Sequence, residues 1–453
     1  MKIKKINTSY TSFELYTLFK DHPYSFFLDS GMDPEKLGKY SFIGFDPFLT
    51  FKSKNKNIEI IENGTTKIYT GDPLEKLQEI LSKYKMDYPS ELPFLGGAVG
   101  YFGYDLCHHM EKLPRTAVDD VNIPDCYFGL YDGTIIIDHQ KNEVFISSLG
   151  IKDHEDKIIS KIEDRIQNKN LPTIKKSTKK MTQITSNFKK EDYIKAIHKI
   201  KDYIRSGDIY QANMTQRFEC DLHKSPLELY KNLREINPAP FASFIDFGEG
   251  QIVSSSPERF VEIKNNIIET RPIKGTRPRG NTPQEDIKNK EELLTSEKDQ
   301  SELLMIVDLE RNDLGRVSKT GTVKVTELFH LEAYPTVYHL VSTIVGELKD
   351  DYDVIDCIRA TFPGGSITGA PKIRAMEVID ELEPTQRNIY TGSIGYIGFN
   401  GDIDLNIVIR TILCKDEKAY FQVGGGIVWD SDAELEYEET LHKGRALMEA
   451  LNS

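Results

Sequence analysis

Arg271-Pro272-Ile273-Lys274-Gly275-Thr276-Arg277-Pro278-Arg279 places a lysine between two prolines and directly before a glycine. Proline restricts the backbone and glycine allows a close approach to a ligand, so Lys274 is suited to face a bound molecule. Neighbouring arginines and partial burial would lower the pKa of Lys274 and favour the neutral amine that a nucleophile needs. Taken alone, the segment is more typical of a basic surface loop with a solvated lysine, since surface lysines are common.

Strand and turn signals lead into this segment. Two β-like runs flank Asn265-Asn266, and the second runs directly into the lysine segment, which predicts a β-hairpin. Glu258 lies on the first of these runs, so in the hairpin it could come near Lys274 and act as its base. A surface pair between Glu258 and Arg259 is the alternative. Farther along, Asn400-Gly401 between two β-like runs predicts a second hairpin with a type I′ turn.

Helix signals alternate with these strands. Thr282-Pro283-Gln284-Glu285 has the form of a capping box, and Ser296 with Asp299 predicts the cap of the following helix. An earlier helix ends at Gly207 and carries the apolar stripe Tyr193, Ile197, Ile200 and Ile204. Paired strands with intervening helices indicate an α+β fold with antiparallel sheet.

The chain divides at residues 168–187, a stretch rich in Lys, Ser, Thr and Asn without apolar periodicity. We expect an N-terminal domain over 1–167, a linker over 168–187 and a catalytic domain over 188–453. A long surface loop inside one domain is the alternative interpretation of this stretch.

Composition excludes several classes of protein. The 453 residues carry a net charge of −13, which argues against general binding to nucleic acid or anionic membranes. No apolar run reaches about 18 residues, so we expect neither a signal peptide nor a membrane span. Five scattered cysteines form no Cys-x-x-Cys motif and predict reduced thiols in a cytoplasmic protein.

Two acid pairs are candidates for a metal site. Asp299 and Glu302 lie three residues apart on one expected helix, and Glu436 and Glu439 do so on the C-terminal helix, followed by Lys443. Such pairs on partly apolar faces are costly unless a cation neutralises them. If the two helices face each other, they form an oxygen-only site suited to Mg²⁺. Two charged faces turned toward water are the alternative.

Two glycine-rich stretches are candidates for ligand contacts. Gly424-Gly425-Gly426 interrupts an apolar strand, which suggests a close approach of the backbone to a ligand, with a β-bulge as the alternative. Phe362–Lys372 opens a helix at Pro371 and could bind an anion there, although its spacing departs from that of a phosphate loop. His339 lies in an apolar context that is typical of a core histidine.

Together these motifs resemble the chorismate-utilising enzyme family over about residues 188–450. The matching segments are Ser206–Asn213, Pro257-Glu258, the Lys274 segment, Leu304–Asp313, Phe362–Lys372, Tyr390–Tyr396 and Gly424–Lys443. The N-terminal third matches more loosely, through Ser30, Lys39–Gly44 and Gly96–Ala98. The resemblance implies two packed antiparallel β-sheets flanked by helices, with an N-terminal lobe and a chorismate-binding lobe.

The resemblance also implies roles for particular residues. Glu302 and Glu439 match the ligands of Mg²⁺, with Asp299 and Glu436 as neighbours. The residues matching positions that hold the substrate are Gly275, Tyr390, Arg410, Gly424, Gly425, Gly426 and Lys443. Thr276 and His339 match residues near the ring of chorismate.

Lys274 indicates the reaction within the family. Members that make anthranilate carry alanine at this position, whereas members that aminate carbon 4 of chorismate carry lysine. Members that add water use a lysine where this chain has Gln211. The resemblance therefore implies conversion of chorismate and ammonia to 4-amino-4-deoxychorismate, on the route to 4-aminobenzoate and folate. Formation of anthranilate is the alternative.

The implied mechanism uses Lys274 as a covalent nucleophile and Glu258 as its base. Ammonia would come from a separate glutaminase subunit, because the chain shows no Gly-x-Cys-x-Gly motif. Some family members hold tryptophan in the N-terminal lobe. The residues that match this pocket are Ser30, Tyr40, Ser41, Phe42, Ile43, Pro240, Phe241 and Ala242.

Overall fold

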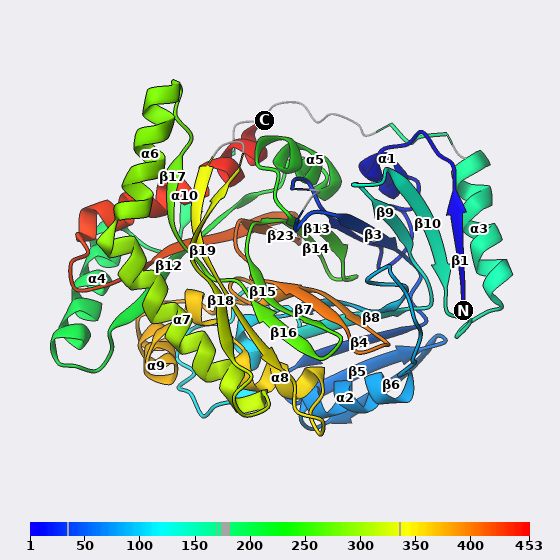
Figure 1. Cartoon of the computed structure of the whole chain (residues 1–453), viewed down its shortest axis with the longest axis horizontal. Coiled ribbons are helices and arrows are strands. Elements are labelled where there is room, and N and C mark those ends of the chain that lie inside the picture. The colour runs from blue at the N-terminus through cyan, green and yellow to red at the C-terminus, as the bar shows by residue number, and fades with distance from the viewer. Residues whose placement is uncertain (34–35, 169, 174–181, 335–336) are drawn as a thin grey trace.

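A computed structural model describes residues 1–33, 36–168, 170–173, 182–334 and 337–453. Within these residues the strands form two antiparallel sheets of twelve strands each, stacked face to face (Figure 1). The predicted α+β fold with two packed antiparallel sheets is confirmed.

The first sheet contains strands from both ends of the chain. Its order is β1 (Lys2–Ile6), β10 (Glu143–Ser148), β9 (Ile135–Asp138), β3 (Tyr40–Gly44), β2 (Phe26–Asp29), β13 (Phe241–Asp246), β14 (Gln251–Ser256), β23 (Thr411–Lys415), β24 (Lys418–Ile427), β12 (Gln211–Asp221) and β11 (Thr185–Ser186), with β20 (Gly369–Ala370) paired to β12.

The second sheet likewise combines strands from the early and late parts of the chain, and it is also antiparallel. Its order is β17 (Ile273–Pro278), β19 (Val337–Glu347), β16 (Ile267–Thr270), β15 (Arg259–Lys264), β22 (Ile403–Asn406), β21 (Ser393–Gly398), β7 (Gly97–Phe102), β8 (Cys126–Tyr131), β4 (Leu49–Lys54), β5 (Asn57–Glu62) and β6 (Thr65–Thr70), with β18 (Lys324–Ala333) paired to β19.

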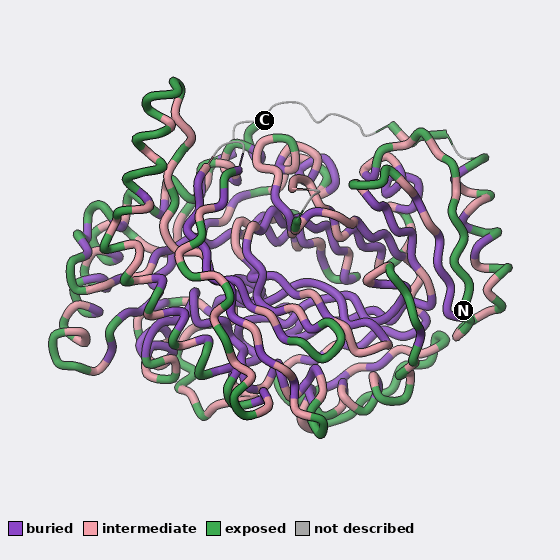
Figure 2. Tube along the Cα trace, in the orientation of Figure 1, coloured by how far each residue is buried: buried purple, intermediate pink, exposed green. Residues whose placement is uncertain are grey.

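Helices lie outside the two sheets (Figure 1). They are α1 (Ser12–Thr17), α2 (Pro73–Lys83), α3 (Glu155–Asn168), α4 (Lys190–Arg205), α5 (Pro226–Ile236), α6 (Pro283–Thr295), α7 (Glu297–Val317), α8 (Val354–Thr361), α9 (Lys372–Leu382) and α10 (Ala433–Asn452), with 3₁₀ turns at Tyr104–His109 and Gly365–Ile367. Helix α6 extends away from the body and is largely exposed (Figure 2).

The side chains of the strands alternate between two cores. In β3, Phe42 packs against Tyr396 of the second sheet, with ring centroids 5.6 Å apart. Its neighbour Ile43 points the other way, into the core beneath helices α1, α3, α5 and α10. This alternation is the two-residue period of a strand, and it fixes the register because a slip of one residue would exchange the two faces.

Most of the predicted local structure is confirmed. Asn265 and Asn266 both have positive φ and join β15 to β16. Thr282 and Ser296 cap α6 and α7, and the apolar stripe predicted before Gly207 lies on α4.

The predicted type I′ turn at Asn400-Gly401 is wrong, although the hairpin forms. Of the two residues, Gly401 alone has a positive φ, whereas a type I′ turn needs positive φ at both. The side-chain carbonyl of Asn400 instead accepts a hydrogen bond from the N–H of Asp402, which closes a longer loop between β21 and β22.

Part of the predicted linker lies outside the described residues, namely 169 and 174–181, so the boundary itself stays a prediction. The strands show a further feature of the organisation. In each sheet the strands up to β10 form one block and the strands from β11 onward form another, and the two blocks join where β2 pairs with β13 and where β7 pairs with β21.

A buried ion pair joins three segments of the later part of the chain, namely 213–215, 367 and 383–387. Arg387 donates to Glu383 at 2.7 Å and to the carbonyls of Asn213 and Ile367, while Glu383 accepts from the hydroxyl of Thr215. The side chains of Arg387 and Glu383 are 1% and 2% exposed. Removing one partner of such a pair leaves an uncompensated buried charge.

We therefore expect Glu383→Ala to lower the free energy of unfolding by about 3–5 kcal/mol, measured by urea denaturation. The control is Glu377→Ala, which removes the partner of the more exposed Arg374 and should cost about 1 kcal/mol or less. Equal losses in the two variants would contradict a structural role for the buried pair.

Candidate active site

The predicted catalytic, substrate and metal residues line one cavity of about 520 Å³. The segments that form it are β17 and β19 of the second sheet, the end of β24 in the first sheet, and helices α7 and α10 (Figure 1). Residues distant in sequence thus meet in one place, as predicted, while their chemical roles stay predictions.

Lys274 reaches this cavity through a local irregularity in β17. The pairing with β19 shifts register between Lys274 and Thr276, and Gly275 between them has a φ of +78°. A β-carbon on Gly275 would lie 2.8 Å from Leu293 and 3.0 Å from Asp299, so a larger residue would not fit. Such bulges redirect side chains next to functional sites.

The amine of Lys274 donates a hydrogen bond to the carbonyl of Ser366 at 2.8 Å. Burial lowers the pKa of Lys274, while the negative charges of Glu258 and Glu302 oppose this effect. A lowered pKa makes the neutral, nucleophilic form of the amine more accessible.

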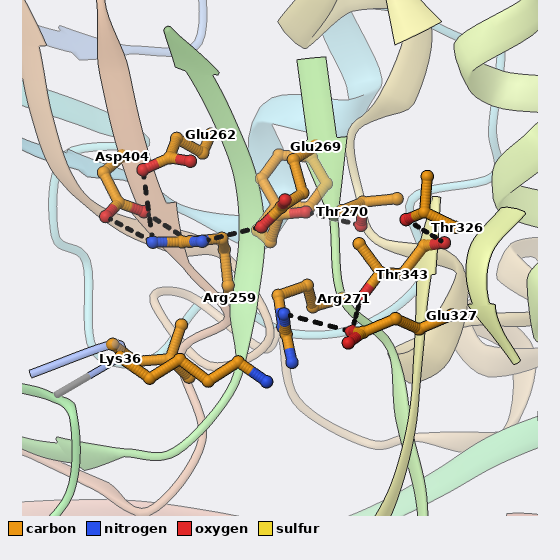
Figure 3. Close-up of polar contacts among 12 residues, drawn as sticks. Lys36, Arg259, Glu262, Glu269, Thr270, Arg271, Thr326, Glu327, Thr343 and Asp404 are labelled. Carbon is orange, nitrogen blue, oxygen red and sulfur yellow. Dashed lines mark hydrogen bonds and ion pairs between the residues drawn. The ribbon is translucent and has the colours of Figure 1, made fainter. Parts of the chain in front are cut away.

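The expected cause of this lowered pKa needs correction, because the neighbouring arginines are neutralised by carboxylates. Arg271 pairs with Glu327 (Figure 3), Arg277 with Asp299 at 3.0 Å, and Arg279 with Asp286. Desolvation is the main cause of the shift, and the cation that adds to it is Lys443 on α10.

Glu258 faces the cavity from the residue before β15. The alternative surface pair with Arg259 is excluded, because the guanidinium of Arg259 binds Asp404 and Glu269 instead (Figure 3). Burial raises the pKa of Glu258, and the charge of Lys274 partly offsets the rise. The two residues are not cross-strand partners, since Lys274 lies on β17, beyond the end of the hairpin.

The two acid pairs face the same cavity from α7 and α10, as predicted. Glu436 accepts from Ser431, Glu439 pairs with Lys443 at 2.6 Å, and Asp299 pairs with Arg277. Burial raises the pKa of Glu302 and of Glu436, and the charge of Glu436 adds to the rise at Glu302. These two carboxylates therefore lie in a region where a cation would be stabilised.

Glycine is required where β24 passes these acids. A β-carbon on Gly425 would lie 3.2 Å from the Oε2 of Glu436, and one on Gly424 would lie 2.3 Å from the carbonyl of Met214. The pairing with β12 continues in register through Gly424, Gly425 and Gly426, so the alternative of a β-bulge is excluded. The strand thus brings its backbone directly against the carboxylates.

Arg410, His339 and Tyr390 also line the cavity. Within the described chain, the guanidinium of Arg410 makes neither an ion pair nor a hydrogen bond, so it is available to an anionic group. His339 is buried, and its Nδ1 lies 2.9 Å from the hydroxyl of Thr276. Burial, with a contribution from Arg410, lowers the pKa of His339 to about 4.

Sequence reasoning missed several lining residues, among them Ser366, Asn213 and Gln422. Ser366 belongs to the glycine-rich stretch that was predicted to bind an anion. In the structure Lys372 of this stretch pairs with Asp313, and the stretch contributes Ser366 and Ile367 to the cavity. Anion binding by this stretch therefore stays a prediction, while its place in the cavity wall is observed.

A second cavity of about 270 Å³ lies between β2, β3 and β13. It is lined by six of the eight residues predicted to hold tryptophan, namely Ser30, Tyr40, Phe42, Pro240, Phe241 and Ala242. Ser41 and Ile43 are not in its wall, because they alternate to the opposite face of β3. Ser41 there contacts His139, and Ile43 packs beneath the helices.

The described residues contain no group of three or more aspartate, glutamate, histidine or cysteine side chains that could hold a metal ion. Nor does any helix among them combine the length and the apolar character that crossing a bilayer demands.

Comparisons with known proteins agree with this geometry. Residues 23–449 match the family described as chorismate binding enzyme. The chain is 43% identical over 459 residues to anthranilate synthase component 1 of Acetivibrio thermocellus, covering 97% of this chain and 92% of that protein. It is 42% identical over 424 residues to aminodeoxychorismate synthase component 1 of Bacillus subtilis (strain 168), covering 91% and 89%.

The fold agrees as well. The crystal structure of anthranilate synthase component I from Streptococcus pneumoniae TIGR4 matches with a TM-score of 0.82 and 34% identity, covering 90% of this chain and 92% of that chain. The curated relatives carry two different names at nearly equal identity. Overall identity therefore does not separate the two reactions.

The burial of His339 generates a prediction about pH. Because its pKa is lowered to about 4, the imidazole stays neutral above that pH, whereas in the unfolded chain it takes up a proton near 6.5. The group thus contributes stability that is fully present above pH 6.5 and is lost as the pH falls toward 4. NMR of histidine-labelled protein should show a His339 resonance, assigned with His339→Gln, that does not titrate between pH 5 and 8. A midpoint near 6.5 in the folded protein would contradict this.

Proposed function

The chain belongs to the chorismate binding enzymes, and from this premise we propose that it is the chorismate-aminating component of an aminodeoxychorismate synthase. The observation that carries the proposal is the amine of Lys274, which lies in the cavity with Glu258 and the acid pairs. Anthranilate-forming members of the family carry alanine at this position and lack such a nucleophile.

Substrate binding in this proposal uses the charges that line the cavity. Arg410 binds a carboxylate of chorismate, since it has no ion-pair partner within the described chain. The backbone of Gly424, Gly425 and Gly426 approaches the ring carboxylate closely, and Lys443 lies beside it once its pairing with Glu439 is exchanged for substrate. Neutral His339 and Thr276 border the ring.

The reaction begins with the amine of Lys274. Glu258 receives a proton that the lysine loses, and the free amine adds to ring carbon 2 as both ring double bonds shift by one position and the bond from carbon 4 to oxygen breaks. The departing hydroxyl takes the proton from Glu258 and leaves as water. Ammonia then adds at carbon 4, both double bonds shift back, and the bond from carbon 2 to Lys274 breaks. The product is 4-amino-4-deoxychorismate.

Mg²⁺ fits the carboxylates that face this cavity. Glu302 and Glu439 would hold the ion, with Glu436 beside them, while Asp299 is engaged by Arg277. In proteins Mg²⁺ is commonly held by one or two carboxylates together with waters and substrate oxygens. When bound, the ion would neutralise the ring carboxylate against the glutamates.

A partner subunit and a further ligand are proposed from the same premise. Relatives named component 1 imply a second component, which we propose to be a glutaminase that supplies ammonia. The cavity between β2, β3 and β13 is proposed to hold tryptophan, in agreement with the six predicted residues in its wall.

Anthranilate synthase component 1 is the second candidate. The observation that favours it is the 43% identity to the Acetivibrio thermocellus protein of that name. The two candidates differ in product, so one assay separates them.

We expect the purified protein, given chorismate, Mg²⁺ and ammonium chloride, to yield 4-amino-4-deoxychorismate and no anthranilate, followed by liquid chromatography and mass spectrometry. Intact-mass analysis should detect a covalent adduct that Lys274→Ala abolishes, with Lys298→Ala, which lies at the cavity wall, as the control that retains it. Anthranilate as the product, or an adduct that survives Lys274→Ala, would refute the proposal.

Removal of divalent metal with EDTA should stop turnover, and added Mg²⁺ should restore it. Glu302→Gln should raise the Mg²⁺ concentration for half-maximal rate about tenfold or more, because it removes a charged ligand. Glu434→Gln on the exposed side of α10 is the matched control. A Mg²⁺ requirement that is unchanged in Glu302→Gln would exclude Glu302 as a ligand.

A further inference from the structure

The proposed reaction needs a proton to pass from Lys274 to Glu258, yet the two side chains are not in contact. Within the described chain the amine of Lys274 makes one hydrogen bond, to the carbonyl of Ser366, and no carboxylate oxygen lies within the 4.0 Å of an ion pair. The carboxylate of Glu258 is near enough to interact electrostatically with Lys274 but accepts a hydrogen bond only from the backbone of Ile273, at 3.4 Å. A group between the two is required.

Ser366 is close to both side chains. Its carbonyl accepts from Lys274, while its hydroxyl is close enough to Glu258 to stabilise the ionised carboxylate. The residue is 4% exposed, and its Oγ has no hydrogen-bond partner within 3.5 Å among the described residues. Buried hydroxyls are normally paired, so one that faces a cavity unpaired suggests a role there.

The position of Ser366 is fixed from both sides. Arg387 donates to the carbonyl of Ile367, and the hydroxyl of Thr368 donates to the carbonyl of Gly364 at 2.9 Å. A β-carbon on Gly365 would lie 2.9 Å from Leu309 of α7, so the turn packs tightly against that helix. A group held this firmly can act without reorganisation during the reaction.

The other hydroxyls near Lys274 are already engaged. Thr276 contacts His339, and Ser296 accepts from the N–H of Asp299 as the cap of α7. Ser366 alone among these three serine and threonine side chains of the cavity wall is free to donate and accept at once.

We propose that the hydroxyl of Ser366 relays the proton between Lys274 and Glu258. The inference rests on the proposed function. In the forward step the ammonium of Lys274 gives a proton to Oγ as Oγ gives its own proton to the carboxylate of Glu258. Ser366 ends unchanged, the amine is free to form its bond to carbon 2, and protonated Glu258 supplies the proton with which the hydroxyl leaves carbon 4 as water.

The charges around Glu258 determine the pH at which this relay operates. Lys274 and Arg410 favour its ionised form, Glu310 of α7 disfavours it, and burial raises its pKa. The Ser366 hydroxyl favours the ionised form, so its removal should raise the pKa of Glu258 and move the acidic limb of the rate profile to higher pH.

The test compares the wild type with Ser366→Ala and Ser366→Thr, using chorismate, Mg²⁺ and ammonium chloride. We expect Ser366→Ala to lower kcat about ten- to hundredfold with KM within about twofold, to slow adduct formation on Lys274 equally, and to shift the acidic limb upward. Ser366→Thr keeps the hydroxyl and should recover most of the rate. Ser366→Gly, which also lacks it, takes the place of the alanine variant if that variant does not fold.

A matched control removes another buried, unpaired hydroxyl far from the cavity. Ser53 on β4 is 2% exposed, and Ser53→Ala should leave kcat and the pH profile as in the wild type. Wild-type kcat in Ser366→Ala, or a loss of kcat with an unmoved acidic limb, would overturn the relay. If the wild type itself makes no 4-amino-4-deoxychorismate, the proposed function fails; if it does and Ser366→Ala matches it, the relay alone fails.

Discussion

The chemistry proposed for the site depends on the desolvation of one amine, that of Lys274. Lys274 is enclosed in a cavity where its charged form is poorly solvated, so its pKa falls, while Glu258 and Glu302 hold enough negative charge nearby to limit the fall. The balance leaves a group that can exist in either protonation state. Without the enclosing walls, the same side chain would be an ordinary surface cation.

Ion pairs around the site limit the effect of the neighbouring arginines on the pKa of Lys274. Arg271 (Figure 3), Arg277 and Arg279 each bind a carboxylate. The cations adjacent in sequence therefore add little to the electrostatic field at the amine of Lys274. These ion pairs also extend across the molecule. Lys36, in the wall of the second cavity, pairs with Glu332, which in turn binds Arg271, three residues before Lys274. A line of ion pairs thus runs from the wall of the second cavity to Arg271, on the segment that leads into Lys274.

The sequence was informative wherever local rules decide the structure. Adjacent asparagines accept positive φ, and threonine and serine cap helices, so the turn at 265–266 and the starts of α6 and α7 could be predicted. The turn at Asn400 was mispredicted because its side chain bonds to Asp402, a choice that composition does not reveal. The residues of the cavity were found because each belongs to a recognisable motif.

Properties that depend on long-range contacts could not be derived in this way. The pairing of β17 with β19 joins segments about sixty residues apart. The ion pair of Arg271 with Glu332 and the hydrogen bond of Lys274 to Ser366 join residues more than sixty positions apart. Sequence patterns predicted that Lys274 and Glu258 lie in the same site. They did not predict that the two side chains form neither a hydrogen bond nor an ion pair with each other.

The pairing of an early strand with a late strand in each sheet bears on how the protein is made. In the first sheet, β2 pairs with β13, whose neighbour β14 pairs with β23 near the carboxyl end. A ribosome that has released only the first half of the chain has therefore produced strands whose partners do not yet exist. Contacts of such long sequence separation form slowly and leave apolar strand surfaces uncovered during synthesis. Nascent chains of this protein should thus depend on chaperones until the last strands emerge.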